Sequence, residues 1–308
     1  MELALLTGLL AAGLRLSMSI GIAALGEAVA QRSGTINVGI EGIMLVGAFL
    51  AAYGALTTGS PWGGLALAVL GGMVLAGIQA WFTIVLRTDQ IVTGIAFVIL
   101  GLGLSGFLFR ISMGGAPSSL PAFRPLDLGP LTALPLVGPV LFGQNILFYL
   151  ALVAAFGIWF VMKRTRLGLA IRACGENPAA ADAAGIRVNR VRAGCTVFGG
   201  AMAALGGAYL AIAQINSFVE DMVVGRGFLA IACVVFGRWH PIGVLLAAIT
   251  FGLAEAAQIR LQTWVPGVPY QFFLVLPYVL GIAALAAMAR SAALPKALGR
   301  PFQSHRRR

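Results

Sequence analysis

"NVGIEGIMLVGAFLAAYG", residues 37–54, is an apolar run in which Glu41 is the only charged residue. A run of about 20 apolar residues is long enough to cross a bilayer as a helix. The whole chain has this character, because 59% of its 308 residues are hydrophobic and only 10% are charged, against about 25% in soluble domains. Its 41 glycines suit helices that pack closely inside a membrane. These features predict an all-α, polytopic transmembrane helical bundle.

Apolar runs of comparable length divide the rest of the chain into membrane segments. They lie at 3–30, 35–57, 62–86, 90–111, 142–162, 193–214, 241–258 and 269–289. The first run is long for one span and holds Arg15, so one helix or two pieces are both open. A shorter run at 227–237 covers only about half of the hydrocarbon core, unless part of 215–226 completes it. We predict about 8–10 membrane segments, some of them broken or re-entrant.

The opening run has a weak internal match. It resembles "VVGRGFLAIACVVFG" at 223–237, and each copy is followed by a proline and a small-residue segment, at 61–79 and 241–258. The two copies are expected to cross the membrane in opposite senses, and inverted repeats with broken helices are typical of transporters. Segments rich in Gly, Ala and Leu also look alike by chance, so an inverted repeat and a coincidence both stay open.

The net charge of +11 comes mainly from basic residues that gather in two places rather than along one soluble face. We therefore expect no nucleic-acid binding. The positive-inside rule places both basic regions in the cytoplasm. The chain is predicted to consist of a transmembrane domain at 1–290, with a cytoplasmic loop at 163–192, and a basic cytoplasmic tail at 291–308. The number of N-terminal crossings, and with it the side of Met1, stays open.

The sequence offers no chemistry of its own to drive transport. Its three cysteines are far apart and match no metal-ligand spacing, so no metal site is expected. Its two lysines, Lys163 and Lys296, do not follow a glycine, so the chain lacks the usual phosphate-binding loop. An active transporter of this composition needs either an ion gradient or a separate ATPase.

One polar stretch interrupts the apolar pattern, "RACGENPAAADAAGIRVNRVR" at 172–192. Asn177 and Pro178 are typical of a helix start, and Gly185 is typical of a helix end. The predicted helix of about seven residues is too short to be stable alone. It has no large apolar residue to insert into a lipid surface. It is either a helix that docks into a groove on a partner protein or a solvated loop whose arginines only set the topology.

This stretch resembles the coupling-helix segment of binding-protein-dependent ABC importer permeases. "SGTINVGIEGIMLVGAF" (33–49) and "GRGFLAIACVVFGRWHPIG" (225–243) are similar to the branch that contains ribose, branched-chain amino acid and nucleoside permeases. "NVGIEG" and "GRWHPIG" are most similar to the nucleoside type. The resemblance implies that a cytoplasmic ATPase receives the residues Gly175, Glu176, Asn177, Pro178, Ala181, Asp182, Gly185, Arg187 and Arg190.

The resemblance also implies partners and a location. It implies a second permease subunit, a periplasmic or lipid-anchored solute-binding protein and a multi-pass position in a bacterial inner membrane, with the C-terminus in the cytoplasm. ATP would be bound by the partner, so this chain is expected to be no enzyme and to hold no cofactor. Nucleosides are the first expected substrate class, with simple sugars and branched-chain amino acids as alternatives.

Polar residues inside apolar runs are costly in a membrane and need a reason. The candidates for a translocation pathway are Asn37, Glu41, Gln79, Arg226, Glu255 and Gln258. Asn37 and Glu41 are four residues apart, which predicts one shared helix face, and Arg32 or Arg226 is the expected partner of Glu41. Each candidate can instead hold helices together.

Arg226 has three alternatives. It can contact the solute, it can contact the solute-binding protein, or it can form a local ion pair with Glu220 or Asp221. A rival function of another class is a proton-coupled secondary carrier, with Glu27, Glu41 or Glu255 as the proton relay and no need for an ATPase.

Overall fold

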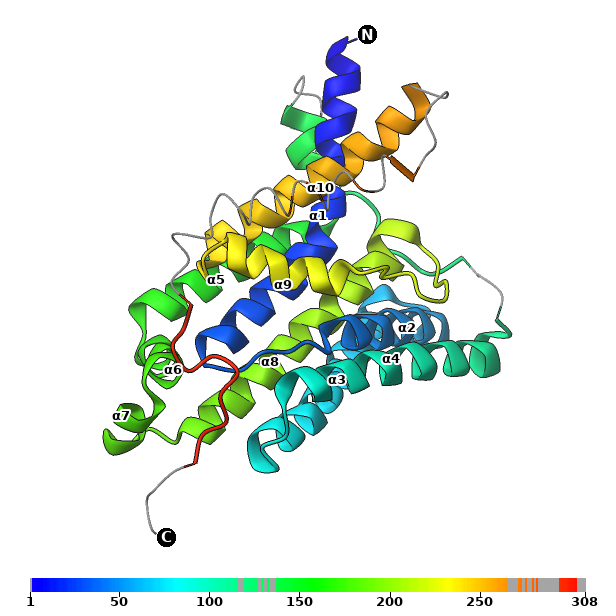
Figure 1. Cartoon of the computed structure of the whole chain (residues 1–308). Helices are drawn as coiled ribbons and strands as arrows, with labels where there is room; N and C mark the ends of the chain where they lie inside the picture. The colour runs from blue at the N-terminus through cyan, green and yellow to red at the C-terminus, as the bar shows by residue number, and fades with distance from the viewer. Residues whose placement is uncertain are drawn as a thin grey trace.

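The computed structural model describes residues 2–115, 119–126, 129, 132, 137–264, 271–272, 275, 279, 281 and 294–303. Within this part the chain is helical, and the single isolated β-bridge joins Pro125 and Asn145. Seven of the described helices are long and apolar enough to cross a membrane. The prediction of an all-α, polytopic bundle is therefore confirmed (Figure 1).

The helices follow the apolar runs closely. They are α1 (Glu2–Arg32), α2 (Ile40–Thr58), α3 (Pro61–Ala80), α4 (Gln90–Met113), α5 (Ile146–Arg164), α6 (Arg166–Glu176), α7 (Pro178–Ala183), α8 (Val188–Tyr209), α9 (Arg226–Phe236) and α10 (Pro241–Trp264). The π-helical turns η1 (Trp81–Val85) and η4 (Leu210–Ile215) continue α3 and α8, and η3 (Gly138–Phe142) precedes α5. The first run, which holds Arg15, forms one continuous helix rather than two pieces.

Glycines explain the dense centre of the bundle, where α8 packs against α1, α2 and α3. A Cβ atom on Gly207 of α8 would lie 1.9 Å from the carbonyl oxygen of Met44 in α2. A Cβ atom on Gly101 of α4 would lie 2.3 Å from the Cα atom of Gly42. Only glycine permits such close approach of two helix backbones. The outer helices keep large apolar side chains exposed, including Ile111 of α4 and Val153 of α5, as expected for lipid-facing surfaces.

The helical pattern is broken before α2 and before α9. Residues 33–39 form no α-helix, so the predicted run 35–57 was wrong at its start. The turns at 216–225 add no helix to α9, which has 11 residues and covers about half of the hydrocarbon core. The predicted short helix at 227–237 is confirmed. From their meeting ends, α2 and α9 run in different directions (Figure 1), and the alternatives of an inverted repeat and a chance match both stay open.

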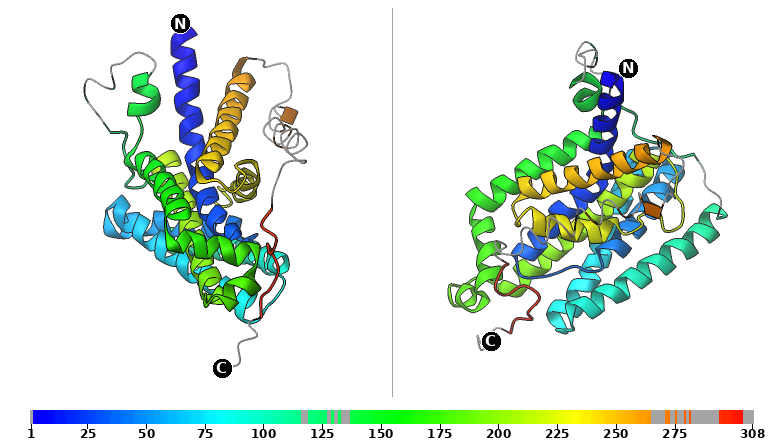
Figure 2. Two further views of the ribbon diagram at one scale, coloured as in Figure 1. Left: turned by 90° about the vertical axis from the view of Figure 1, so that its left-hand side faces the viewer. Right: turned by 45° about the horizontal axis from the view of Figure 1, so that its top comes forward.

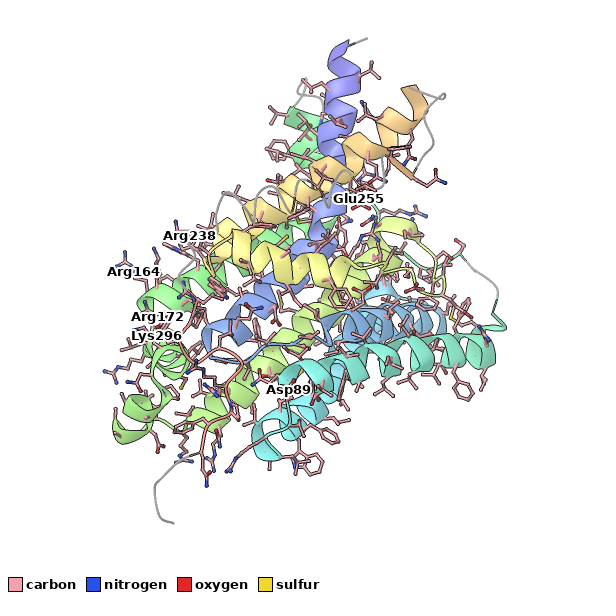
Figure 3. All side chains as sticks on the ribbon, viewed as in Figure 1. Asp89, Arg164, Arg172, Arg238, Glu255 and Lys296 are labelled. Carbon is pink, nitrogen blue, oxygen red and sulfur yellow. The ribbon has the colours of Figure 1, made fainter. Side chains whose placement is uncertain are left out.

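The two ends of the bundle differ. The helices α6 and α7 and the segment 294–303 lie together at the lower left of Figure 1, and the N-terminal part of α1 projects at the opposite end in both views of Figure 2. The labelled basic residues Arg164, Arg172, Arg238 and Lys296 gather toward the first end, whereas Glu255 lies nearer the second (Figure 3). The predicted span at 269–289 lies almost entirely outside the described residues.

Candidate functional site: coupling segment and polar core

Helix α7 has the end signals that the sequence indicates. The Oδ1 atom of Asn177 accepts a hydrogen bond from the Ala180 N–H at 3.1 Å, and Pro178 is the first helical residue. Gly185 has φ +93°, a conformation that favours glycine. The predicted start and stop are therefore confirmed, and the helix has six residues where about seven were expected.

One face of α7 is small and open to a partner. This face is formed by four exposed alanines, Ala179, Ala180, Ala183 and Ala184. Ala181 is 3% exposed and packs in a small cluster with Cys174 and Val188. The predicted coupling residues Glu176, Asn177, Gly185, Arg187 and Arg190 are exposed, and Asp182 is half-buried. The surface therefore combines a flat alanine face with two flanking arginines.

Helix α6 joins α7 to the membrane helices. This helix was not predicted, because residues 163–192 were expected to form a loop around α7 alone. The Thr165 hydroxyl caps α6 by accepting from the Gly168 N–H at 3.2 Å. At its other end, a Cβ atom on Gly175 would lie 2.2 Å from the Arg32 carbonyl oxygen. Gly175 therefore permits backbone contact between the end of α6 and the end of α1.

Arg192 is a buried anchor of this junction that was not predicted, because it counted only as one positive charge of the loop. Its side chain is 2% exposed. Its guanidinium donates to the carbonyl oxygens of Ser33 (3.1 Å), Cys174 (3.2 Å) and Arg300 (2.7 Å). Its place directly before the apolar run 193–214 was the available signal, since a buried charge needs several partners.

The C-terminal segment 294–303 takes part in the same junction. The Ala297 N–H donates to the Gly175 carbonyl oxygen at 2.9 Å, and the Gly299 N–H donates to that of Gly34 at 3.1 Å. Phe302 packs against the cluster beneath α7. The coupling segment, the linker that follows α1 and the C-terminal segment therefore form one hydrogen-bonded unit.

Glu41 connects the two breaks of the bundle. It is 4% exposed, and its carboxyl oxygens accept from the Gly225 N–H at 2.7 Å and the Gly227 N–H at 2.6 Å. These N–H groups belong to the start of α9, so Glu41 caps that helix from α2. Asn37 precedes α2, and the prediction that Asn37 and Glu41 share a helix face is wrong because the linker at 33–39 breaks the helical spacing.

The expected ion pairs of this region are also corrected. Arg226 pairs with Glu255 of α10 at 2.5 Å, not with Glu220, Asp221 or Glu41. Glu220 pairs instead with Arg110 at 2.8 Å, and this exposed hydrogen-bonded pair holds the pKa of Glu220 below its usual range.

Arg32 does not pair with Glu41 either. Its guanidinium donates to the carbonyl oxygens of Trp239 at 3.2 Å and Arg238 at 3.3 Å. Arg32 therefore holds the end of α1 against the turn that follows α9.

The remaining pathway candidates are buried amides. Both side-chain polar atoms of Asn37 and of Gln79 lack a hydrogen-bond partner, and both residues are 1% exposed. Gln258 is also buried. The structure brings Glu41, Arg226 and Glu255 to the start of α9, whereas Gln79 lies on α3 and joins no described hydrogen bond through its side chain. Buried amides without partners are costly, so Asn37 and Gln79 stay candidates for the translocation pathway.

Seven described helices of membrane-spanning length define a multi-pass membrane protein. The chain belongs to the family described as "Branched-chain amino acid transport system / permease component", which it matches over residues 9–285. It is thus a permease component of an ABC transporter, a transport subunit rather than an enzyme. Such permeases work with an ATPase and a solute-binding protein.

Individual relatives are similar over most of the chain. Identity is 38% over 260 residues to a putative glucose ABC transporter permease protein of Haloferax volcanii, covering 83% of this chain and 78% of that protein. It is 36% over 294 residues to the guanosine ABC transporter permease protein of Bacillus subtilis, covering 91% and 92%. It is 34% over 286 residues to a nucleoside ABC transporter permease protein of Lactococcus lactis, covering 89% and 90%. No solved structure matches the chain.

Proposed function

We propose that this chain is the membrane-spanning subunit of an ATP-driven importer of nucleosides, and that α7 is its contact with the ATPase. The observation that carries the proposal is the construction of α7, which is capped at both ends, open on an alanine face and tied to the membrane helices through Gly175 and Arg192. A helix that only set the topology would not need this buried anchor. The nucleoside assignment is supported by two relatives named for guanosine and for nucleosides.

Motion of α7 has a short physical route to the polar core. The Cys174 carbonyl of α6 and the Ser33 carbonyl after α1 share the guanidinium of Arg192. The linker that starts at Ser33 leads directly to α2, whose Glu41 caps α9. We therefore propose that a shift of α6 and α7 moves the linker and changes how α9 is held. The pathway would be lined by Asn37, Glu41, Gln79, Arg226, Glu255 and Gln258.

The proposed assembly has a second permease subunit beside this one, because a single chain offers one α7 surface for an ATPase. The solute-binding protein, periplasmic or lipid-anchored, would dock at the end opposite α7. The segment 294–303 shares hydrogen bonds with the α6–α7 junction, which supports a C-terminus on the cytoplasmic, ATPase-bearing side. Simple sugars and branched-chain amino acids stay the alternative solutes.

The rival proton carrier would require its carboxyl groups to exchange protons along a path. Glu27 accepts from Gln31 and from the Asn37 N–H, whereas Glu41 holds the start of α9 and Glu255 holds Arg226. Among the described residues, no hydrogen bond joins two of these carboxyl groups. This arrangement favours a structural task for each one over a proton relay.

The deciding experiment is reconstitution of the complex purified from its native membrane into proteoliposomes. We expect an ATPase and a second permease to copurify. We also expect guanosine uptake to require ATP on the side of the membrane that carries the ATPase and a guanosine-loaded solute-binding protein on the other side. Uptake by the chain alone under a proton gradient would overturn the proposal. ATP-driven uptake of leucine or glucose but not of guanosine would overturn only the substrate assignment.

A further inference from the structure

A polar cavity of about 600 Å³ lies at the end of the bundle that is remote from α7. It is bounded by the start of α5 and the end of η4, whereas α6 and α7 adjoin the opposite ends of α5 and α8. Its volume lies within the range of about 300–1,000 Å³ that is usual for small-molecule sites. None of the six pathway candidates lines it, so it is distinct from the polar core around Glu41.

The wall formed by residues 119–126 is fixed in place. The Leu120 N–H donates to the Asn216 carbonyl oxygen at 3.2 Å, and the Phe123 N–H donates to that of Ile212 at 2.9 Å. The Leu126 N–H donates to the Gln144 carbonyl oxygen at 3.0 Å. An extended segment tied to two helix ends by its own backbone gives the cavity a preformed shape, as binding sites usually have.

Two glutamines supply acceptors without partners. Gln144 is 1% exposed, and its Nε2 atom donates to the Val140 carbonyl oxygen at 2.9 Å while its Oε1 atom has no partner. The Oε1 atom of the half-buried Gln214 also has no partner. Asn145 is already used, because it caps α5 and donates to the Ala213 carbonyl oxygen. A buried amide oxygen left without a donor is unfavourable, so both glutamines suit a ligand that carries N–H or O–H groups.

The charged residues of the lining restrict the ligand further. Arg15 and Arg124 line the cavity, and among the described lining residues none is acidic. The ammonium group of a free amino acid would find two like charges and no carboxylate there. Guanidinium groups donate to the carbonyl oxygen and ring nitrogen of a guanine edge, and amides pair with purine edges. Leu120 and Phe123 add apolar wall on which a flat base can lie.

Resting on the proposed function, we propose that this cavity is a binding site for an uncharged purine nucleoside on the outer side of the permease. The amide oxygens of Gln144 and Gln214 would accept from the base or ribose, and Arg15 and Arg124 would donate to the ring acceptors. The site would hold the solute after its release by the binding protein and before it reaches the polar core.

The test uses the intact permease–ATPase complex without binding protein and 8-azidoguanosine as a photoreactive probe. We expect the label on peptides that contain residues 119–125, 144 or 214, with competition by guanosine and not by leucine. Gln214→Leu keeps the side-chain size and removes the amide, and should lower labelling about tenfold, the loss expected for one hydrogen bond. Gln271→Leu makes the same change at an exposed position outside the cavity and should leave labelling unchanged.

Label that falls only elsewhere, an absence of label, or equal labelling of the Gln214→Leu and wild-type complexes would overturn the inference. Thermal melting of each variant shows that the fold is kept. Guanosine uptake by the wild-type complex separates the two proposals. Uptake together with an unlabelled cavity overturns the site alone, whereas a complex that imports no nucleoside overturns the proposed substrate.

Discussion

Glu41→Gln tests whether the carboxyl group of α2 holds the broken helix α9. The two oxygens of Glu41 accept from the Gly225 and Gly227 N–H groups at 2.7 and 2.6 Å in a site where Glu41 is 4% exposed. Glutamine has nearly the same shape but only one acceptor. Its NH₂ group would face the second N–H, so one backbone donor would lose its partner and meet another donor.

The expected loss follows from these two contacts. A hydrogen bond to a charged group contributes about 1.5–3 kcal/mol, and the surviving bond is weakened by about half because its acceptor becomes neutral. The neutral amide is less costly to bury, which offsets part of this loss. We expect a net destabilisation of about 2–3 kcal/mol, which corresponds to a Tm lower by about 3–5 °C for a chain of this size.

The measurement is thermal melting of the detergent-solubilised complex, together with ATP-driven uptake. Glu220→Gln is the matched control, because it makes the same change in the exposed pair with Arg110, and exposed pairs contribute little. We expect the control to melt with the wild type and Glu41→Gln to melt earlier and transport more slowly. A Glu41→Gln complex with the Tm of the wild type would refute the capping of α9.

Three further changes test the coupling segment. Gly185→Val places a β-branched residue at φ +93°, which costs about 1–3 kcal/mol locally. We expect the variant to insert into the membrane normally but to hydrolyse ATP without solute uptake, and normal ATP-driven uptake would contradict the assignment of α7. The double variant Arg187→Glu and Arg190→Glu should weaken copurification of the ATPase. Because both charges are exposed and salt screens them, the loss should be larger at low salt than at high salt. A loss that does not depend on salt would leave these arginines without a docking role. Arg192→Met removes the donor from three carbonyl groups, and each buried carbonyl left without a donor costs about 1–3 kcal/mol. Trypsin should then cut faster after Lys296, and an unchanged cutting rate would show that Arg192 does not hold the C-terminal segment.

The sequence predicted features that depend on local rules. The apolar runs marked the described membrane helices because burial in lipid requires length and apolar composition along one segment. The ends of α7 were predicted because Asn177, Pro178 and Gly185 act on their own backbone. The short α9 was predicted from its length alone, since 11 helical residues cannot span the hydrocarbon core however they pack.

The partners of the polar residues could not be predicted, because they depend on how distant helices pack. Glu41 binds N–H groups 184 and 186 residues away, and no spacing in the sequence indicates them. The expected partnership of Asn37 and Glu41 assumed continuous helix across 33–39. Arg192 was read as a surface charge because basic residues surround it, although its three acceptors come from three separate segments.

The packing also indicates which part of the bundle can move during transport. The contact of α8 with α2 at Gly207 leaves no room for a methyl group, and contacts of that kind are not expected to slide. The linker at 33–39 and the start of α9 are also held by hydrogen bonds, which Arg192 donates at one end and Glu41 accepts at the other, although Gly227 of α9 also packs closely on the backbone of Glu41. Such bonds can exchange partners without opening an apolar core. We therefore expect ATP-driven motion to enter through α7, to pass the Arg192 junction and the linker at 33–39, and to change the position of α9.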